Sequence, residues 1–216
     1  MFEYFFSKFV KKARGRSIRA SSIPSSSKVE SGSTVLNSSF GAHSFCGYDC
    51  SFINCEIGRF CSIAGRVIVG GARHPIEYVS TSPVFLAHKE SISEKFSRHD
   101  YRWEARTIIG DDVWIGEGAW IDNLAQVKIG SNCCISQGAM LLTGNHNYKK
   151  PTFDLITKGI TLEEGAWVGA KAVVCPGVTC ESHSVLSVGS IAVSSLEPYW
   201  IYQGNPAIKV KERVIA

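Results

Sequence analysis

The sequence predicts an all-β protein, a parallel β-helix whose short strands wind round a three-sided prism. Two observations carry this prediction: a six-residue period recurs along the chain, and each unit has an aliphatic residue first and a small residue fifth. A period of six is neither that of a helix, about 3.6, nor the two-residue alternation of a long strand, so each unit must be a short strand followed by a turn. A propeller is excluded because its repeats are about 40 residues long.

The repeat falls into three blocks, each of which opens on an aliphatic residue. They begin at Ile57 with IGRFCS, at Ile109 with IGDDVW and at Leu162 with LEEGAW. Three units form one coil of the prism, and coils stack roughly 4.8 Å apart. The residues that carry the repeat therefore suffice for about six or seven coils, in a prism about 30 Å long.

The composition of the unit follows from the shape of the prism. The first residue points inward, and the fifth is small because it fills a narrow interior, as at Cys61, Ala119 and Ser190. The second position is repeatedly glycine, as at Gly58 and Gly110. At that position the chain turns a corner, and a side chain is costly there.

Three segments are expected: an N-terminal arm over residues 1–34, the β-helix over 35–197 and a C-terminal tail over 198–216. The arm starts MFEYFFSKFVKKARGR, in which phenylalanines are mixed with bases, and this pattern predicts a short amphipathic helix. It lacks the continuous apolar segment and cleavage site of a signal peptide, so we expect a cytoplasmic protein. Two roles for this helix remain open. It can pack against the body or a neighbouring subunit, or it can make a weak contact with the inner face of a membrane.

The net charge of +4 comes from this arm. Residues 1–19 hold six basic residues and one acidic residue, a charge of +5, so the rest of the chain sums to −1. A nucleic-acid-binding protein needs a basic face on its folded body to neutralise phosphates, which excludes that class here. No apolar stretch approaches the roughly 18–20 residues of a membrane-spanning helix.

Eight cysteines are present, and none of them forms a CxxC pair. Cys46, Cys50 and Cys55 lie close together, but no second pair of ligands follows at the spacing of a zinc finger. We therefore expect the cysteines to be small buried hydrophobic residues, and we expect no metal site.

Two excursions interrupt the repeat, at about residues 75–107 and about residues 145–159. Each begins with a histidine, His74 in the first case and His146 in the second. Functional residues gather on loops that a rigid scaffold holds in place. The chemistry of the protein is therefore expected at these two places.

The quoted motifs resemble those of the acetyltransferases built on a left-handed β-helix of hexapeptide repeats. Residues 109–214, with IGDDVWIGEGAW, TGNHNYKKP and GNPA, resemble the colanic-acid-type exopolysaccharide O-acetyltransferases. Residues 56–108 resemble the xenobiotic and capsular branch, so the two resemblances cover about three quarters of the chain. The family resemblance implies a homotrimer that uses acetyl-CoA, with active sites between neighbouring prisms. Trp114, Trp120 and Trp167, at the outward sixth position, are consistent with buried contacts between subunits.

Acetyl transfer from a thioester needs a base for the proton of the acceptor, and an imidazole, with an ordinary pKa of about 6.5, suits this role. His146, in TGNHNY, matches the catalytic histidine of the colanic-acid-type enzymes. His74, in RHP, matches that of the xenobiotic branch and is the alternative base. A third interpretation is that both are structural loop histidines.

The resemblance also implies a binding site for the donor. The residues expected to line the groove for its pantetheine arm are Gly169, Ala170, Gly189 and Ser190. Lys171 and Lys209 are candidates to bind the CoA phosphates. The family commonly has a Thr-Lys-Asp turn where this chain has Val193-Ser194-Ser195, so Lys209 is expected to replace the missing cation.

The expected function is O-acetylation of a sugar hydroxyl in a surface polysaccharide or its precursor. One alternative is an N-acetyltransferase of an amino sugar, or an acetyltransferase that inactivates an antibiotic. A second alternative is a β-helix scaffold without activity, which would not require a loop histidine near the terminal coils.

Overall fold

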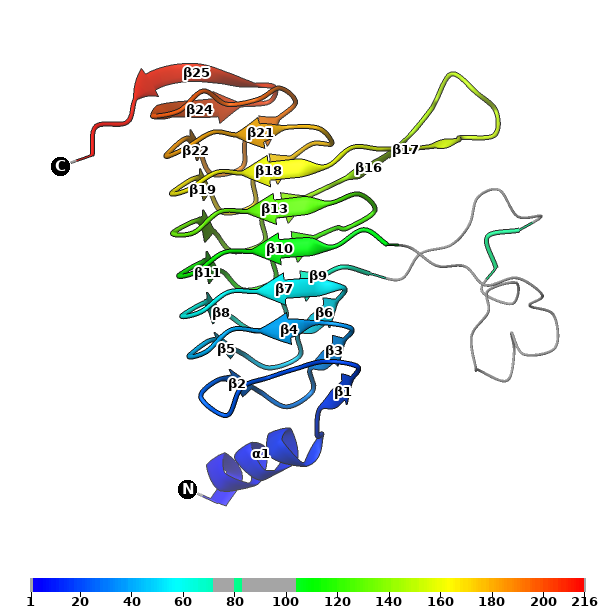
Figure 1. The fold of residues 1–216 in the computed structure, drawn as a ribbon, viewed down its shortest axis with the longest axis vertical. Coiled ribbons are helices and arrows are strands. Elements are labelled where there is room, and N and C mark those ends of the chain that lie inside the picture. Colours follow the sequence, from blue (N-terminus) through cyan, green and yellow to red (C-terminus); the bar gives the residue numbers. More distant parts are fainter. Residues whose placement is uncertain (1, 72–79, 83–103, 216) are drawn as a thin grey trace.

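The computed structural model describes residues 2–71, 80–82 and 104–215. Figure 1 shows a tall prism of stacked coils, with the helix α1 (Phe2–Ala13) at its N-terminal end. Successive strands visit three faces in turn, so that each face is a sheet made of strands from successive coils. Because neighbouring coils pair in parallel, the predicted parallel β-helix is confirmed.

The three sheets are named faces I, II and III. Face I holds β1 (Ser17–Arg19), β3 (Thr34–Leu36), β6 (Ser51–Ile53), β9 (Ile68–Val69), β12 (Trp120–Ile121), β15 (Met140–Leu141), β20 (Val173–Val174) and β23 (Ile191–Ala192). Face II holds β4 (Ser39–Phe40), β7 (Cys55–Ile57), β10 (Thr107–Ile109), β13 (Val127–Ile129), β18 (Ile160–Leu162) and β21 (Thr179–Cys180). Face III holds β2 (Lys28–Val29), β5 (Phe45–Cys46), β8 (Ser62–Ile63), β11 (Trp114–Ile115), β14 (Cys134–Ile135), β19 (Trp167–Val168), β22 (Val185–Leu186), β24 (Trp200–Gly204) and β25 (Ala207–Glu212).

The core is a single column of side chains along the axis of the prism. First-position residues such as Ile115 and Ile135 are fully buried, and so are the fifth-position alanines Ala119 and Ala139. Full burial of an aliphatic side chain of this size contributes about 1.5–3 kcal/mol. The predicted inward positions of the unit are confirmed, and they hold the three faces together.

The second-position glycines are required by close stacking. A Cβ on Gly110 would lie 2.7 Å from the backbone nitrogen of Ser131, and a Cβ on Gly130 would lie 2.8 Å from that of Glu164. Real Cβ atoms do not approach a backbone this closely. Glycine at this position therefore lets one coil rest directly on the next.

Six of the eight cysteines are buried, as predicted, and Cys134 and Cys175 are half-buried. Cys46, Cys50 and Cys55 are at most 2% exposed. Burial raises the pKa of the Cys55 thiol to about 12, which keeps it protonated and unreactive. Among the described residues, no group of three or more histidine, cysteine, aspartate or glutamate side chains is arranged to hold a metal ion.

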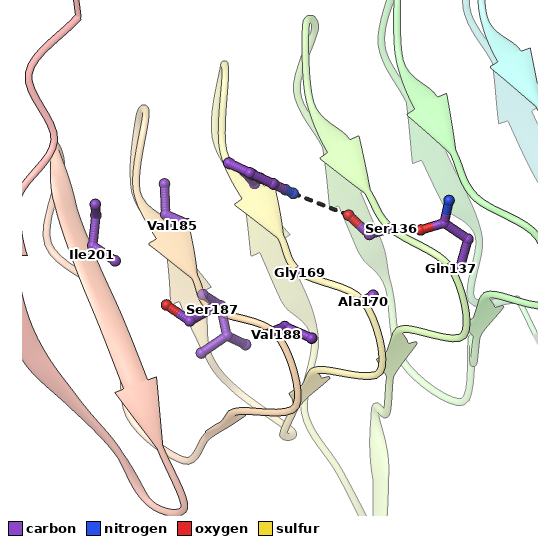
Figure 2. Close-up of a pocket in the computed structure, with 10 residues that line it drawn as sticks. Ser136, Gln137, Gly169, Ala170, Val185, Ser187, Val188 and Ile201 are labelled. Atoms are coloured by element: carbon purple, nitrogen blue, oxygen red, sulfur yellow. Dashed lines mark hydrogen bonds between the residues drawn. The ribbon is translucent and has the colours of Figure 1, made fainter.

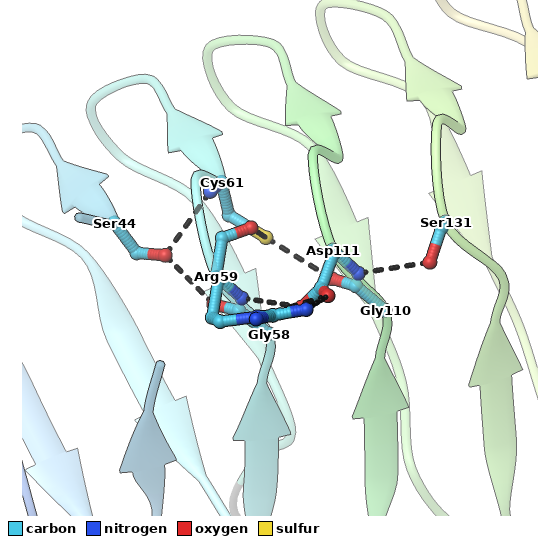
Figure 3. Close-up of polar contacts among 7 residues, drawn as sticks. All are labelled: Ser44, Gly58, Arg59, Cys61, Gly110, Asp111 and Ser131. Atoms are coloured by element: carbon cyan, nitrogen blue, oxygen red, sulfur yellow. Dashed lines mark hydrogen bonds and ion pairs between the residues drawn. The ribbon is translucent and has the colours of Figure 1, made fainter. Parts of the chain in front are cut away.

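Fifth-position serines and cysteines also link neighbouring coils through hydrogen bonds, as Figure 3 shows. The Ser44 hydroxyl donates to the Gly58 carbonyl (2.7 Å) and accepts from the Cys61 amide (3.0 Å). The Cys61 thiol donates in turn to the Gly110 carbonyl (3.2 Å). These side chains satisfy backbone groups that the turns leave without partners.

The prism extends beyond the predicted boundaries at both ends. Within the predicted arm, β1 pairs with β3 and β2 pairs with β5. Within the predicted tail, β24 pairs with β22. Face I therefore has eight strands among the described residues, and the chain completes eight coils instead of six or seven. The first coil was hidden in the sequence because it has the buried Ser33 at a fifth position, where the next coils have Cys50, Val67 and Ala119.

The arm forms the predicted helix, but the phenylalanines of this helix do not pack against the body. None of the residues of α1 is buried. The helix contacts the prism through its other side instead; the Ser31 hydroxyl, for example, donates to the Lys11 carbonyl (2.6 Å). No helix in the described part of the chain is long and apolar enough to span a membrane.

The two predicted excursions leave the prism between faces I and II. Much of the longer one lies outside the described residues; after it, β10 pairs in register with β7, Ile109 opposite Ile57. The shorter one is a two-stranded antiparallel hairpin, β16 (Gly144–His146) and β17 (Leu155–Thr157), inserted between β15 and β18. Figure 1 shows this hairpin projecting from the prism near its C-terminal end.

Candidate active site

The β16–β17 hairpin is fixed to the prism at Thr143, the fully buried residue that precedes β16. The Thr143 hydroxyl donates to Oδ2 of Asp122 (2.8 Å) and accepts from the Ala125 amide (3.1 Å). The Thr143 carbonyl accepts from the Lys158 amide (2.9 Å) just beyond β17. These bonds join both strands of the hairpin to the corner of the coil below.

His146 lies at the end of β16 with its side chain exposed. Its ring nitrogen Nδ1 is 2.6 Å from the carbonyl oxygen of Phe153 on the returning part of the hairpin. A carbonyl only accepts hydrogen bonds, so this contact requires the proton of a neutral imidazole to be on Nδ1. The lone pair on Nε2 is then available to accept a proton.

The tip of the hairpin is organised round Asp154. The Asp154 carboxylate accepts hydrogen bonds from Nζ of Lys150 (2.6 Å) and from the Thr152 hydroxyl (2.6 Å). The backbone carbonyl of Asp154 accepts from the Asn147 amide (2.8 Å). The hydrogen bond from Lys150 holds the pKa of Asp154 below its usual value. The hairpin therefore carries internal contacts that hold Phe153 beside His146.

A groove of about 490 Å³ lies on face III, on the opposite side of the prism from the edge that carries the hairpin. It crosses β14, β19, β22 and β24 along the axis of the prism, as Figure 2 shows. Its lining residues are Ser136, Gln137, Trp167, Gly169, Ala170, Val185, Leu186, Ser187, Val188 and Ile201. The Trp167 indole nitrogen donates to the Ser136 hydroxyl (3.0 Å), which fixes the indole on one wall.

Four of the predicted donor-binding residues lie at this groove or directly beside it. Gly169 and Ala170 line it, and Lys171 follows at the corner with a left-handed φ of 55°. Gly189 lies in the next coil, where its amide donates to the Ala170 carbonyl (2.8 Å). A Cβ on Gly169 would meet the Val188 nitrogen at 2.6 Å, so the groove has a glycine at this point of its wall because the coils touch there.

The other two predicted donor-binding residues lie elsewhere. Ser190 is 1% exposed, and its hydroxyl accepts from the Gly204 amide (3.0 Å) inside the prism. Lys209, on β25, pairs with Glu197 (2.5 Å) and lies 3.9 Å from the centre of the Trp200 ring. The alternative base His74 is outside the described residues.

No protein-family model matches the sequence. The chain is 32% identical over 114 residues to the colanic acid biosynthesis acetyltransferase WcaF of Escherichia coli K12, a match that covers 53% of this chain and 62% of WcaF. It is 31% identical over 113 residues to a chloramphenicol acetyltransferase of Klebsiella aerogenes, covering 43% of this chain and 54% of that protein. Both relatives are named as acetyltransferases.

The fold of the chain is also found in a solved structure. AntD, an N-acyltransferase from Bacillus cereus whose crystal structure contains dTDP and 3-hydroxybutyryl-CoA, superposes with a TM-score of 0.55. The match covers 96% of this chain and 88% of AntD at 14% identity, so it concerns the fold alone. The predicted fold class, a left-handed parallel β-helix of hexapeptide repeats, is confirmed. The chain matches less than two thirds of the length of these two curated relatives.

Sequence reasoning missed most of the groove, although the repeat of this hexapeptide-repeat chain contains a signal for it. Two units of face III, ISQGAM and LSVGSI, carry serine at the second position, where glycine is usual. These serines are Ser136 and Ser187, and the glycine of the unit between them on face III is Gly169. Consecutive second positions on one face therefore form the floor of the groove.

Proposed function

We propose that this chain is an acetyl-CoA-dependent O-acetyltransferase that modifies a sugar hydroxyl of a surface polysaccharide or its precursor. The observation that carries the proposal is the contact of 2.6 Å between Nδ1 of His146 and the Phe153 carbonyl, which leaves Nε2 as a base on an exposed hairpin. WcaF is named for colanic acid biosynthesis, and this name supports a polysaccharide acceptor. The 3-hydroxybutyryl-CoA bound to AntD supports a CoA donor. The dTDP-4-amino-4,6-dideoxyglucose bound to a mutant of AntD supports a sugar acceptor.

The residues of the chain supply the proton transfer. Nε2 of His146 removes the proton from the acceptor hydroxyl as its oxygen becomes bonded to the acetyl group, and the proton then passes to the departing thiolate. Such general base catalysis contributes about 10²–10⁴-fold to the rate. Acetyl-CoA, when bound, supplies the activated thioester, so the reaction forms an acetyl ester and a free thiol. The Phe153 carbonyl keeps the imidazole in the tautomer that this step requires.

The groove on face III fits the donor. Its walls are mostly apolar, with Val185, Val188 and Ile201 on one side, and it runs along four strands, which is about 14 Å at the usual strand spacing. A narrow apolar channel with a glycine in its wall suits an extended chain such as the pantetheine arm. At the edge of the groove, Ala170 would bind the amides of the pantetheine arm and Lys171 the phosphates of CoA.

A second copy of the chain completes the proposed site. Within one prism the hairpin lies at the edge between faces I and II, and face III lies across the prism from that edge. The base and the groove therefore meet only if the hairpin of one copy lies against face III of another. We propose a homotrimer, which is also consistent with Trp114, Trp120 and Trp167, exposed by 37%, 45% and 45% in the single chain.

The activity is tested by measuring thiol release from acetyl-CoA with a panel of polysaccharides, sugars, amino sugars and antibiotics. We expect transfer to a hydroxyl of a polysaccharide or its precursor, and its loss in His146→Ala. His43→Ala is the matched control, because His43 is an exposed histidine far from the hairpin. Transfer only to amino groups, or full activity of His146→Ala, would contradict the proposal.

The shared site is tested by mixing two inactive variants. His146→Ala lacks the base, and Ala170→Trp fills the groove. In randomly mixed trimers about a quarter of the sites would combine an intact hairpin with an intact groove from its neighbour. Recovery of about a quarter of the activity supports a site between subunits, whereas no recovery by a correctly assembled mixture contradicts it.

A further inference from the structure

The N-terminal helix α1 exposes a stripe of large apolar side chains. Phe2, Phe5, Phe6 and Phe9 recur at the spacing of a single helical face and are 58–80% exposed. Val10 extends the same stripe. Soluble surfaces rarely leave so many aromatic rings together in water, so this stripe indicates a binding surface.

The opposite side of α1 holds the helix to the prism. Nζ of Lys11 lies 5.3 Å from the centre of the Tyr48 ring, and Arg14 pairs with Asp49 (3.1 Å). The Gly32 amide donates to the Gly15 carbonyl (2.6 Å) just after the helix. Lys11 is two residues beyond Phe9, about 200° round the helix. The phenylalanine stripe is therefore directed away from the prism, and Figure 1 shows α1 lying across its N-terminal end.

The charge near the stripe indicates what covers it. Residues 1–19 carry six bases and one acid, whereas the rest of the chain sums to −1. Lys8 and Lys12 lie one turn apart, beside the stripe. A second copy of α1 is a poor partner because like charges on the two helices would repel each other. An apolar layer beneath an anionic surface complements both features, because the rings enter the apolar layer and each Lys or Arg near such a surface strengthens binding.

We propose that α1 docks the protein on an anionic lipid bilayer. Phe2, Phe5, Phe6 and Phe9 enter the boundary between head groups and acyl chains, and Lys8 and Lys12 contact lipid phosphates. The helix lies in the plane of the membrane, with the prism standing on it. This role is independent of the transferase chemistry and would hold for an inactive His146→Ala protein as well.

The proposal is tested by sedimentation of the full chain with vesicles of phosphatidylglycerol and phosphatidylcholine, and with vesicles of phosphatidylcholine alone. We expect binding to the anionic vesicles that weakens at high salt. The double variant Phe5→Ser and Phe9→Ser should bind at least about tenfold more weakly, because each ring loses its burial. The matched control replaces Ile208 and Val210, two exposed apolar residues on β25, with serine and should bind like the wild type.

The role of charge is tested with Lys8→Glu and Lys12→Glu together, against Lys128→Glu and Lys211→Glu on the prism. The first pair should abolish binding to anionic vesicles, and the second pair should leave most of it. Melting temperatures of all variants should match that of the wild type, since none of the substituted side chains is buried. The proposal is overturned if the wild type stays in the supernatant with anionic vesicles. It is also overturned if the phenylalanine variant binds normally, or if that variant changes only the oligomeric mass in light scattering.

Discussion

The β16–β17 hairpin and the groove on face III differ in how the chain holds them in place. The groove is built from second-position residues of successive coils, each fixed by the coils above and below it. The hairpin projects from the prism and is fixed by a few hydrogen bonds, chiefly those of Thr143 to Asp122 and of Nδ1 of His146 to Phe153. The proposed donor site is thus held rigid by the repeated coils, while the proposed base depends on individual contacts. Single substitutions should therefore affect the two regions differently.

The largest effect is expected from removing the base. His146→Ala should lower kcat by about 10²–10⁴-fold and leave the KM for acetyl-CoA nearly unchanged, because the imidazole acts on the acceptor proton and not on the donor. Steady-state kinetics with saturating acceptor measures both constants. A variant with normal kcat would assign the base to another residue, and His74→Ala should then be inactive.

Filling the groove should affect the donor instead. Ala170→Trp is expected to raise the KM for acetyl-CoA by about tenfold or more, while the melting temperature stays unchanged because Ala170 is at the surface of the prism. The control is Glu117→Trp, at the equivalent corner two coils toward the N-terminus and outside the groove. If both variants raise this KM equally, the groove does not bind the donor.

A smaller effect is expected from loosening the base of the hairpin. Asp122→Asn keeps the size of the side chain but loses the charge that accepts the bonds from Thr143, which are worth about 1.5–3 kcal/mol to a charged group. We expect kcat to fall about tenfold without a change in the KM for acetyl-CoA, as for a positioning residue. Asp111→Asn, which breaks a comparable carboxylate contact to Arg59 at a distant corner, should leave kcat unchanged. A change in KM alone would place Asp122 at the donor site.

The smallest effect is expected from a substitution in one wall of the groove. Trp167→Phe removes the hydrogen bond to Ser136 but keeps an aromatic ring, so the KM for acetyl-CoA should rise by a few-fold, in line with about 1 kcal/mol for a neutral hydrogen bond. Trp114→Phe, on the same face but outside the groove, is the matched control. If Trp167→Phe and the wild type have equal kinetics, the Trp167 indole does not contribute to donor binding.

The sequence predicted the features that depend on period and missed those that depend on exceptions within it. Inward residues such as Ile115 and Ala119 repeat strictly, so the fold could be derived from them. His146 could be found because it interrupts the repeat. Ser33 and Ser136 could not, because a buried serine in a hexad can bond to backbone groups inside the prism, as Ser33 does, or line a groove, as Ser136 does. Only the stacking of the coils decides between these environments.

The regular stacking of the coils also sets a height above the membrane. The β1 coil lies next to α1, and β16 leaves the prism after β15, in the sixth coil. Five coil spacings correspond to about 24 Å. With α1 lying on a bilayer, the base therefore acts far beyond the reach of a lipid head group. The proposed acceptor is then a sugar some way along a membrane-attached glycan, and the number of coils between α1 and the hairpin selects how far along that chain it lies.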